Sequence, residues 1–338
     1  MLNQNHYPKI LSTALLTLGA SLPFNAFSVE CGDTITEPTT LTEDLICSIS
    51  GSNTSALTIQ RPGGSLYMAG FSLTCLGSDP SNGIDLAASS GELSTGTING
   101  CNDGVLLSED GFHTVYGMNI LLPLEDAIVV DSNSNTVIGN FTSGDGNDSD
   151  NGIDIDGNYN FISQNVIELS GDEGMEVDGI ANTIIQNTIT GSDDDGVELN
   201  GDFSIFISNT IQDSISMGLV IEGSSCTVSN NTVTDNGSSG ITLQNSASNN
   251  SIAQNTSSDN DDFGIFVSSN NATGNSIVFN TATGNGVFDL IDLFESDDCS
   301  VNNNLWSGNT FRHPIQAALN NYLIKQLGVV TSITHPVI

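Results

Sequence analysis

The chain has 338 residues, of which 40 are acidic and only four are Lys or Arg, so its formal net charge at pH 7 is −36. No Lys or Arg stands between Arg61 and Arg312. Nucleic acids and anionic membranes attract proteins through basic side chains, so this charge excludes both as partners.

Residues 1–28 have the pattern of a secretory signal peptide. Lys9 precedes an apolar stretch over 10–24, and the small-residue phrase Ala26-Phe27-Ser28 follows it. We expect cleavage near Ser28 and Val29 and a secreted or periplasmic mature chain. The apolar stretch is too short to favour a membrane span, so no membrane insertion is expected. The alternative is a buried N-terminal strand.

Residues 29–80 are interpreted as an N-terminal cap with short strands at 56–59 and 65–68. The six cysteines of the chain suit an oxidising compartment. Plausible pairs near the cap are Cys31 with Cys47 and Cys75 with Cys101, although six cysteines allow fifteen complete connectivities. Cys226 takes the turn position that Asn182 fills earlier in the repeat, which favours a free thiol.

Residues 81–311 contain a phrase that returns about every 22 residues and consists of glycine, an aliphatic residue, any residue and a second aliphatic residue. Fixed-period self-similarity indicates stacked structural units. A second phrase keeps the same period and closes on asparagine. The first phrase begins at Gly152, Gly174, Gly196, Gly218, Gly240 and Gly264, and the second closes at Asn140, Asn165, Asn187, Asn209, Asn231, Asn255 and Asn280.

The alternation inside each phrase is that of a β-strand, since apolar and polar residues exchange at every position. Short strands joined by Gly, Asn, Asp and Ser turns, identical from unit to unit, wind into a parallel β-helix. The sequence therefore predicts an all-β, single-stranded parallel β-helix with two inward columns. The first column is Ile153, Met175, Val197, Leu219, Ile241 and Ile265, and the second is Ile162, Ile184, Phe206, Val228, Ile252 and Ile277.

The closing phrases at 182–187, 250–255 and 275–280 resemble the right-handed parallel β-helix repeat family. The resemblance extends from about residue 80 to 311 and includes the NosD-like branch and the carbohydrate-active β-helix enzymes. It implies a right-handed coil, in line with the usual handedness of parallel crossovers. The repeat is specific for fold and poor for function, because many activities share it.

The end of the chain departs from the repeat. The stretch 288–293 is interpreted as an interruption, after which the repeat resumes once at 304–311 with Trp306 in the inward position. Residues 312–338 form a C-terminal extension. Its apolar spacing favours a helix that covers the end of the core, and an unstructured tail is the open alternative.

Carboxylates occupy the outward positions on successive turns between residues 150 and 200. If the repeats stack about 4.8 Å apart, they form a grid of like charges. Such a grid is costly unless it is solvated, protonated or bound to cations, and a set of oxygen ligands suits calcium. A solvated acidic face is the alternative. The candidate calcium ligands are Asp150, Asp154, Asp156, Asp172, Glu176, Asp178, Asp194 and Glu198.

The same grid offers catalytic candidates, because paired carboxylates hydrolyse glycosides. Asp154, Asp172 and Asp194 resemble a faint version of the polygalacturonase acid phrases, but the histidine-glycine and Arg-x-Lys phrases of that family have no counterpart here. The arginine base of pectate lyases and the Asp-Pro-His phrase of alginate epimerases are also missing. His113 is the one histidine of the repeats, and a structural role is favoured for it.

Two functional hypotheses remain. The first is a secreted, acidic β-helix protein that binds calcium and an extracellular polysaccharide without catalysis. The second is a lyase, epimerase or glycoside hydrolase that uses Asp154, Asp172 and Asp194. The missing catalytic phrases favour the first.

Overall fold

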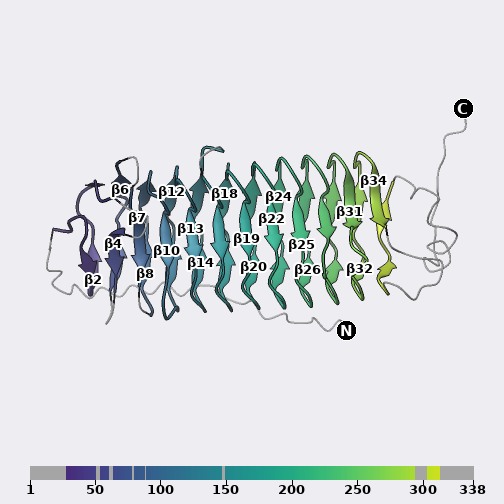
Figure 1. The fold of residues 1–338 in the computed structure, drawn as a ribbon, viewed down its shortest axis with the longest axis horizontal. Helices are drawn as coiled ribbons and strands as arrows, with labels where there is room; N and C mark the ends of the chain where they lie inside the picture. The colour runs from purple at the N-terminus through teal and green to yellow at the C-terminus, as the bar shows by residue number, and fades with distance from the viewer. Residues whose placement is uncertain are drawn as a thin grey trace, which may run out of the picture.

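In the computed structural model the chain is an elongated coil of short parallel strands that stack along one axis (Figure 1). The structure describes residues 28–50, 54–60, 64–77, 80–87, 89–146, 149–293 and 303–312. The signal peptide expected over 1–28 and the extension expected over 312–338 therefore lie almost wholly outside the described residues. Within the described ranges all regular structure is β, and no helix is long and apolar enough to cross a membrane.

The strands form three parallel sheets of 12 strands each, and consecutive turns of the coil add one strand to each sheet. The first sheet, called sheet A, contains β1 (Thr34–Ile35), β4 (Ser55–Ile59), β7 (Asn82–Leu86), β10 (Val105–Leu107), β13 (Ile128–Val130), β16 (Ile153–Ile155), β19 (Met175–Val177), β22 (Val197–Leu199), β25 (Leu219–Ile221), β28 (Ile241–Leu243), β31 (Phe263–Val267) and β34 (Phe288–Asp292).

Sheet B follows sheet A in each turn. It contains β2 (Pro38–Thr40), β5 (Ser65–Tyr67), β8 (Glu92–Ser94), β11 (Thr114–Tyr116), β14 (Thr136–Ile138), β17 (Phe161–Ser163), β20 (Thr183–Ile185), β23 (Ile205–Ile207), β26 (Thr227–Ser229), β29 (Ser251–Ala253), β32 (Ser276–Val278) and β35 (Leu305–Ser307).

Sheet C completes the turn. It contains β3 (Leu45–Cys47), β6 (Ser72–Cys75), β9 (Thr97–Asn99), β12 (Asn119–Leu121), β15 (Phe141–Ser143), β18 (Val166–Glu168), β21 (Thr188–Thr190), β24 (Thr210–Gln212), β27 (Thr232–Thr234), β30 (Thr256–Ser258), β33 (Thr281–Thr283) and β36 (Thr310–Phe311).

Both predicted inward columns are confirmed. All twelve side chains are fully buried, and each lies opposite its counterpart in the next strand, as Ile153 lies opposite Met175 and Ile162 opposite Ile184. Trp306 continues the second column opposite Ile277. Stacking of equivalent apolar side chains removes most of their surface from water, which stabilises the coil.

The predicted asparagine column runs through the interior as a hydrogen-bonded ladder. The backbone N–H of Asn187 donates to Oδ1 of Asn209 over 2.8 Å, and its Nδ2 donates to the same oxygen over 3.1 Å and to the Ile162 carbonyl over 3.1 Å. Asn165 and Asn209 make the same contacts one rung away on either side. The ladder satisfies backbone groups that the turn would otherwise bury without partners.

The repeated glycine is required by the close approach of successive rungs. A Cβ on Gly174 would lie 2.6 Å from the Gly196 carbonyl oxygen, too close for any side chain. In β34 the equivalent position is Asp289, since β34 pairs with β31 in register. The interpretation of 288–293 as an interruption is therefore wrong. Because β34 is the last strand of sheet A in the described residues, no following carbonyl occupies the place of its Cβ.

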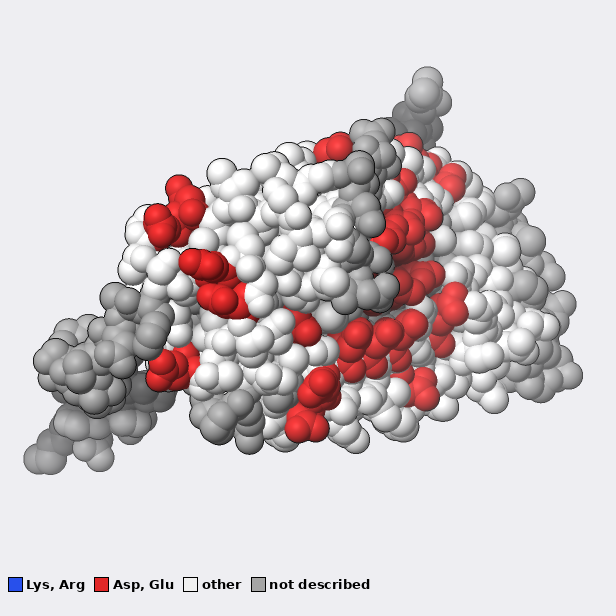
Figure 2. Space-filling view, turned by 60° about the vertical axis from the view of Figure 1, so that its left-hand side comes forward, with Lys and Arg blue, Asp and Glu red and all other residues white. Residues whose placement is uncertain are grey.

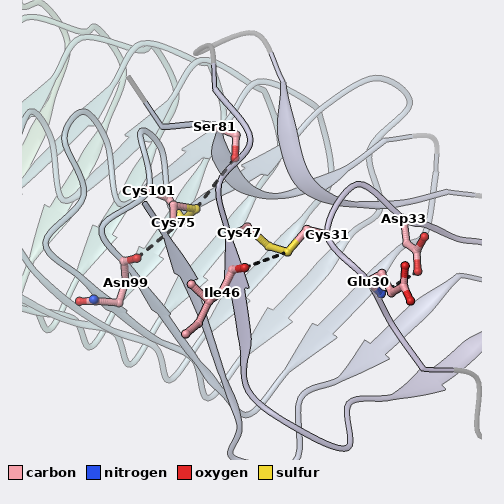
Figure 3. Close-up of a disulfide and its surroundings, with 9 residues drawn as sticks. All are labelled: Glu30, Cys31, Asp33, Ile46, Cys47, Cys75, Ser81, Asn99 and Cys101. Carbon is pink, nitrogen blue, oxygen red and sulfur yellow. Dashed lines mark hydrogen bonds between the residues drawn. A yellow bond between two sulfur atoms is a disulfide. The ribbon is translucent and has the colours of Figure 1, made fainter. Parts of the chain in front are cut away.

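Two disulfides close the N-terminal end of the coil (Figure 3). Cys31 is bonded to Cys47 and Cys75 to Cys101, as expected from their positions. Cys226 is a buried free cysteine. Its backbone N–H donates to Asn250 Oδ1, so Cys226 does take an asparagine position in an inner ladder. Disulfides of this kind persist in oxidising compartments. Cys299 lies outside the described residues.

Candidate functional site

Asp154, Glu176 and Glu198 stand on the outer face of sheet A on three successive rungs. Asp154 pairs with Glu176 in the register of β16 and β19, and Glu176 pairs with Glu198 in β19 and β22. All three side chains are half-buried, because residues of the preceding and following turns flank them. The expected column of outward carboxylates is therefore present in the fold.

A second column precedes the strands. The backbone N–H of Asp172 donates to the Asp150 carbonyl over 3.4 Å, and that of Asp194 donates to the Asp172 carbonyl over 3.3 Å. These three residues therefore occupy equivalent turn positions on successive rungs. The spacing places Asp150, Asp172 and Asp194 beside the first column, as the sequence predicts.

A third column follows the strands. Asp156 and Asp178 are exposed on neighbouring rungs, and Asn200 takes the next place. Nδ2 of Asn200 donates to Oδ1 of Asp178 over 2.9 Å and to Oε2 of Glu198 over 3.2 Å. This amide ties the first and third columns together at one end. We call the three columns, together with Glu173, the acidic face.

Asp172, Glu173 and Asp194 come closest to one another. One carboxylate oxygen of each residue lies within 4.8 Å of the others. Glu173 is half-buried and Asp194 is exposed, so the group opens to solvent. Asp154 does not belong to this group, so the three catalytic candidates do not converge on one point. The sequence ligand set omitted Glu173, although its place between Asp172 and Gly174 is visible in the repeat.

The acidic face raises the pKa of several of its own carboxyl groups. Burial is the largest cause, followed by repulsion from neighbouring acids, and the pKa of Glu173 reaches about 8 and that of Asp154 about 7. Burial and neighbouring charges also raise the pKa of Asp172, Glu176 and Glu198. Both effects disfavour the charged form of a carboxyl group.

Two further carboxyl groups with raised pKa values lie on rungs closer to the N-terminus. Asp103 and Asp126 occupy the position just before the strand, where Glu173 stands later, and Asp126 Oδ1 accepts a hydrogen bond from the Asn151 N–H over 2.8 Å. Burial raises the pKa of Asp103 to about 6 and that of Asp126 to about 8. The sequence prediction missed both residues, because it considered only the carboxylates between residues 150 and 200.

One turn near the acidic face is longer than the others. Residues 144–152 join β15 to β16, and Gly146 lies against the carboxylate of Asp193, which is 3.6 Å from the place of a Cβ. The sequence of this turn over 145–152 offers oxygen-bearing side chains at alternate positions, which is similar to part of a calcium loop. Its residues 147 and 148 lie outside the described residues.

His113 has a structural role. It is buried, its Nδ1 accepts a hydrogen bond from the Gly91 N–H over 3.0 Å, and its Nε2 lies 3.0 Å from the Ser108 carbonyl oxygen. Because Nδ1 accepts, Nε2 carries the proton and donates it to that carbonyl. Both ring nitrogens are therefore committed within the rung, and Tyr116 lies on the surface.

Within the part of the chain that the structure describes, the acidic face has no Lys or Arg partner. Figure 2 shows Asp and Glu side chains gathered across the middle of one face, with no Lys or Arg among them. The sequence explains this, since no basic residue other than His113 stands between Arg61 and Arg312. Calcium is bound by oxygens at about 2.3–2.6 Å, so the oxygens around one ion lie at most about 5 Å apart. The spacing of Asp172, Glu173 and Asp194 fits that requirement.

Comparison with known proteins places the fold. Residues 151–312 match the family model described as right handed beta helix region. A double mutant of the periplasmic alginate epimerase AlgG superposes with a TM-score of 0.63 at 14% identity, over 85% of this chain and 80% of that chain.

Two tailspike proteins share the same architecture. The Dettilon tailspike protein gives a TM-score of 0.56 at 16% identity, and a mutant tailspike of E. coli bacteriophage HK620, solved with a pentasaccharide, gives 0.59 at 9%. In both cases the similarity covers 82% of this chain and 60% of the other. A search of curated protein sequences found no match. Residues 151–312 therefore match the right-handed β-helix model, and the same three-sheet coil runs from β1 to β36.

Proposed function

We propose that this protein is a secreted β-helix that binds calcium on its acidic face and, with calcium in place, an extracellular polysaccharide. The observation that carries the proposal is the convergence of Asp172, Glu173 and Asp194, with oxygens within 4.8 Å of one another and no Lys or Arg partner among the described residues. The two disulfides support an oxidising compartment.

Electrostatics explains why a cation is needed. Two carboxylates about 4.8 Å apart repel by about 3.5 kcal/mol at an effective dielectric constant of about 20. A bound divalent cation would remove this repulsion and would favour the charged form of Glu173. All-oxygen ligands suit calcium better than zinc or copper, which prefer nitrogen and sulfur.

The architecture of the coil supports the proposal that the ligand is a polysaccharide. The solved structures of similar fold include an alginate epimerase and a tailspike protein bound to a pentasaccharide. An anionic glycan would be repelled by the acidic face, so it would need calcium as a bridge, whereas a neutral glycan would not. The calcium dependence of glycan binding therefore identifies the glycan class.

The calcium site is tested by isothermal titration of the purified protein with calcium after removal of metals by a chelator. We expect the variants Asp172→Asn, Glu173→Gln and Asp194→Asn each to weaken calcium binding by at least tenfold. Asp235→Asn is a matched control, because Asp235 is an exposed aspartate in a turn away from the acidic face. Absence of calcium heat in the wild-type protein, or equal binding by all variants, would disprove the site.

A second candidate function is glycoside hydrolysis. Because the pKa of Glu173 is raised to about 8, its carboxyl is protonated at neutral pH, as a general acid must be. Asp172 and Asp194 each have a carboxylate oxygen within 4.8 Å of one of Glu173, and such closeness of acid and nucleophile is typical of retaining rather than inverting enzymes. Release of reducing ends from pectin, alginate or neutral glycans, and its loss in Asp172→Asn with Asp194→Asn, would favour this function over binding alone.

A further inference from the structure

A column of surface side chains alternates between aromatic and small residues on the turn that joins sheet A to sheet B. Each residue of the column donates its backbone N–H to the carbonyl that precedes its counterpart on the next rung, over 2.8–3.1 Å. The column is therefore in register along the coil. Its members are Ser90, Phe112, Ser134, Tyr159, Ala181, Phe203 and Ser225.

The aromatic residues of this column occur on every second rung. Phe112, Tyr159 and Phe203 are 62%, 64% and 60% exposed, whereas Ser134 and Ala181 stand between them. Adjacent rungs lie about 4.8 Å apart, so consecutive rings lie about 9.6 Å apart. The small residues leave open space between neighbouring rings.

The backbone makes this placement costly. Every residue of the column has a left-handed backbone, with φ of 60° at Phe112, 58° at Tyr159 and 59° at Phe203. Glycine and asparagine adopt this conformation most readily, and a bulky aromatic residue does so at a conformational cost. These rings also remain in water, so burial in the core does not offset the cost. Backbone strain that is not compensated by packing in the core indicates a functional surface.

Neighbouring apolar side chains enlarge the exposed apolar surface beside two of the three aromatic residues. Phe161 and Ile205 stand two residues after Tyr159 and Phe203, and both are exposed on the outer face of sheet B. On the intervening rung the equivalent residue is Thr183. The alternation of large and small surfaces therefore continues from the turn into the sheet.

The surroundings define the chemistry of a ligand. Asp156 and Asp178 lie on the turn just before this column, and no Lys or Arg lies between Arg61 and Arg312. An anionic ligand would be repelled, and nothing in the column recognises a phosphate or a peptide carboxylate. Flat aromatic rings at a regular spacing suit the apolar faces of pyranose rings, which stack on aromatic side chains.

We propose that Phe112, Tyr159 and Phe203 form an aromatic ladder that binds an extended polysaccharide lying parallel to the coil axis. Two rungs match the repeat of an extended disaccharide, so every second sugar stacks on a ring while the sugar between them passes over Ser134 or Ala181. The ladder deepens the proposed function, because it rests on a polysaccharide ligand and names the surface that holds it. Its long axis runs beside the acidic face, where calcium would bind.

The probes are cellohexaose, a neutral β-1,4-linked glycan, and a mannuronate hexamer, its anionic counterpart, each titrated by calorimetry with calcium and with chelator. We expect one of them to bind, and we expect Tyr159→Ala and Phe203→Ala each to lower its affinity at least tenfold. Asn249→Tyr, which adds a ring at the next alternate rung, is expected to raise affinity for a longer oligomer of the same glycan.

Phe279→Ala is the matched control. Phe279 is equally exposed and has a φ of 57°, but it stands alone in a different turn column. Its replacement should leave affinity unchanged, and far-ultraviolet circular dichroism checks that all variants fold. Calcium titration of Tyr159→Ala separates the two proposals, since the ladder can fail while the calcium site remains.

Three results would overturn the ladder. One is equal affinity of Tyr159→Ala, Phe203→Ala and wild type for both hexamers. Another is binding of neither hexamer by the wild-type protein. The third is a wild-type dimer in sedimentation that Phe203→Ala converts to a monomer while glycan affinity stays unchanged, which would make the ladder a contact between two copies.

Discussion

Glu176 lies directly opposite Asp154 in the parallel pairing of β16 and β19, so two carboxylates point outward from the same sheet one rung apart. Burial is the largest cause of the raised pKa of both groups, and repulsion from Glu176 adds to the rise at Asp154, whereas Asp178 and Glu198 add to the rise at Glu176. Parallel stacking of near-identical repeats makes this contact unavoidable, because an acid that recurs at the repeat period must meet its own copy on the next rung.

The stability of the metal-free protein should decrease as the pH rises. The pKa values of Asp103, Asp126, Asp154 and Glu173 are raised to about 6, 8, 7 and 8. Between about pH 4 and pH 8 the folded state therefore binds more protons than the unfolded chain, and the free energy of unfolding falls across that window. Urea denaturation in a chelator near both limits measures the change.

Calcium should reverse this loss near the upper limit and have little effect near the lower one, where protons compete for the same oxygens. A free energy of unfolding that is independent of pH in chelator would show that the carboxylates are ordinary solvated groups. Asp235→Asn should behave as wild type throughout.

Asp126→Asn should stabilise the protein near the upper end of the same window. Asparagine keeps the oxygen that accepts the Asn151 N–H and removes a charge that repels Asp154 and Asp103. The expected gain in the free energy of unfolding is on the order of 1–2 kcal/mol near pH 8 and close to zero near pH 4. Thermal denaturation at both values tests it, and a loss of stability at the higher pH would contradict it.

Asn187→Ala should destabilise the coil by about 2–4 kcal/mol, because it removes the buried oxygen that accepts the Asn165 N–H and the buried amide that donates to Asn209 Oδ1 and the Ile162 carbonyl. Gln186→Ala, one residue away in the same turn and exposed, should change stability by less than about 0.5 kcal/mol. Chemical denaturation of the two variants decides this. Equal stabilities would show that the ladder contributes nothing.

Removal of the disulfide between Cys31 and Cys47 should lower the free energy of unfolding by about 3 kcal/mol, since the bond closes a loop with a sequence separation of 16 residues. The double variant Cys31→Ser with Cys47→Ser is compared with Cys226→Ser, which removes the buried free thiol and should cost less than about 1.5 kcal/mol. A double variant as stable as wild type would mean that strand pairing alone holds the first rungs.

Much of the fold could be predicted from the sequence. An apolar residue that returns at a fixed period, as Ile153 and Met175 do, has one means of burial, namely stacking on its copy. The same argument placed the inner asparagines and the outward column of Asp154, Glu176 and Glu198. The reasoning failed at Phe288–Asp292, because the glycine it relied on reflects a neighbouring rung and the last rung of sheet A has none.

The features that could not be predicted from the sequence depend on the lengths of individual rungs. Asn135 and Asn160 are one rung apart yet 25 residues apart, whereas Asn160 and Asn182 are separated by 22. The rung between Asn135 and Asn160 is longer because of the turn that joins β15 to β16. A search at one fixed residue spacing therefore does not find the alternation of Phe112, Tyr159 and Phe203. The same turn also lies beside the group in which Glu173 joins Asp172 and Asp194.

The sequence by itself determined that the chain coils, which side chains fill the interior and that one outer face is acidic, because these follow from a period and an alternation. Only the tertiary structure decided which carboxylates converge, which of them are held protonated and which aromatic rings share a column. Those properties depend on distances between neighbouring turns and on burial from water, and residue spacing along the chain specifies neither.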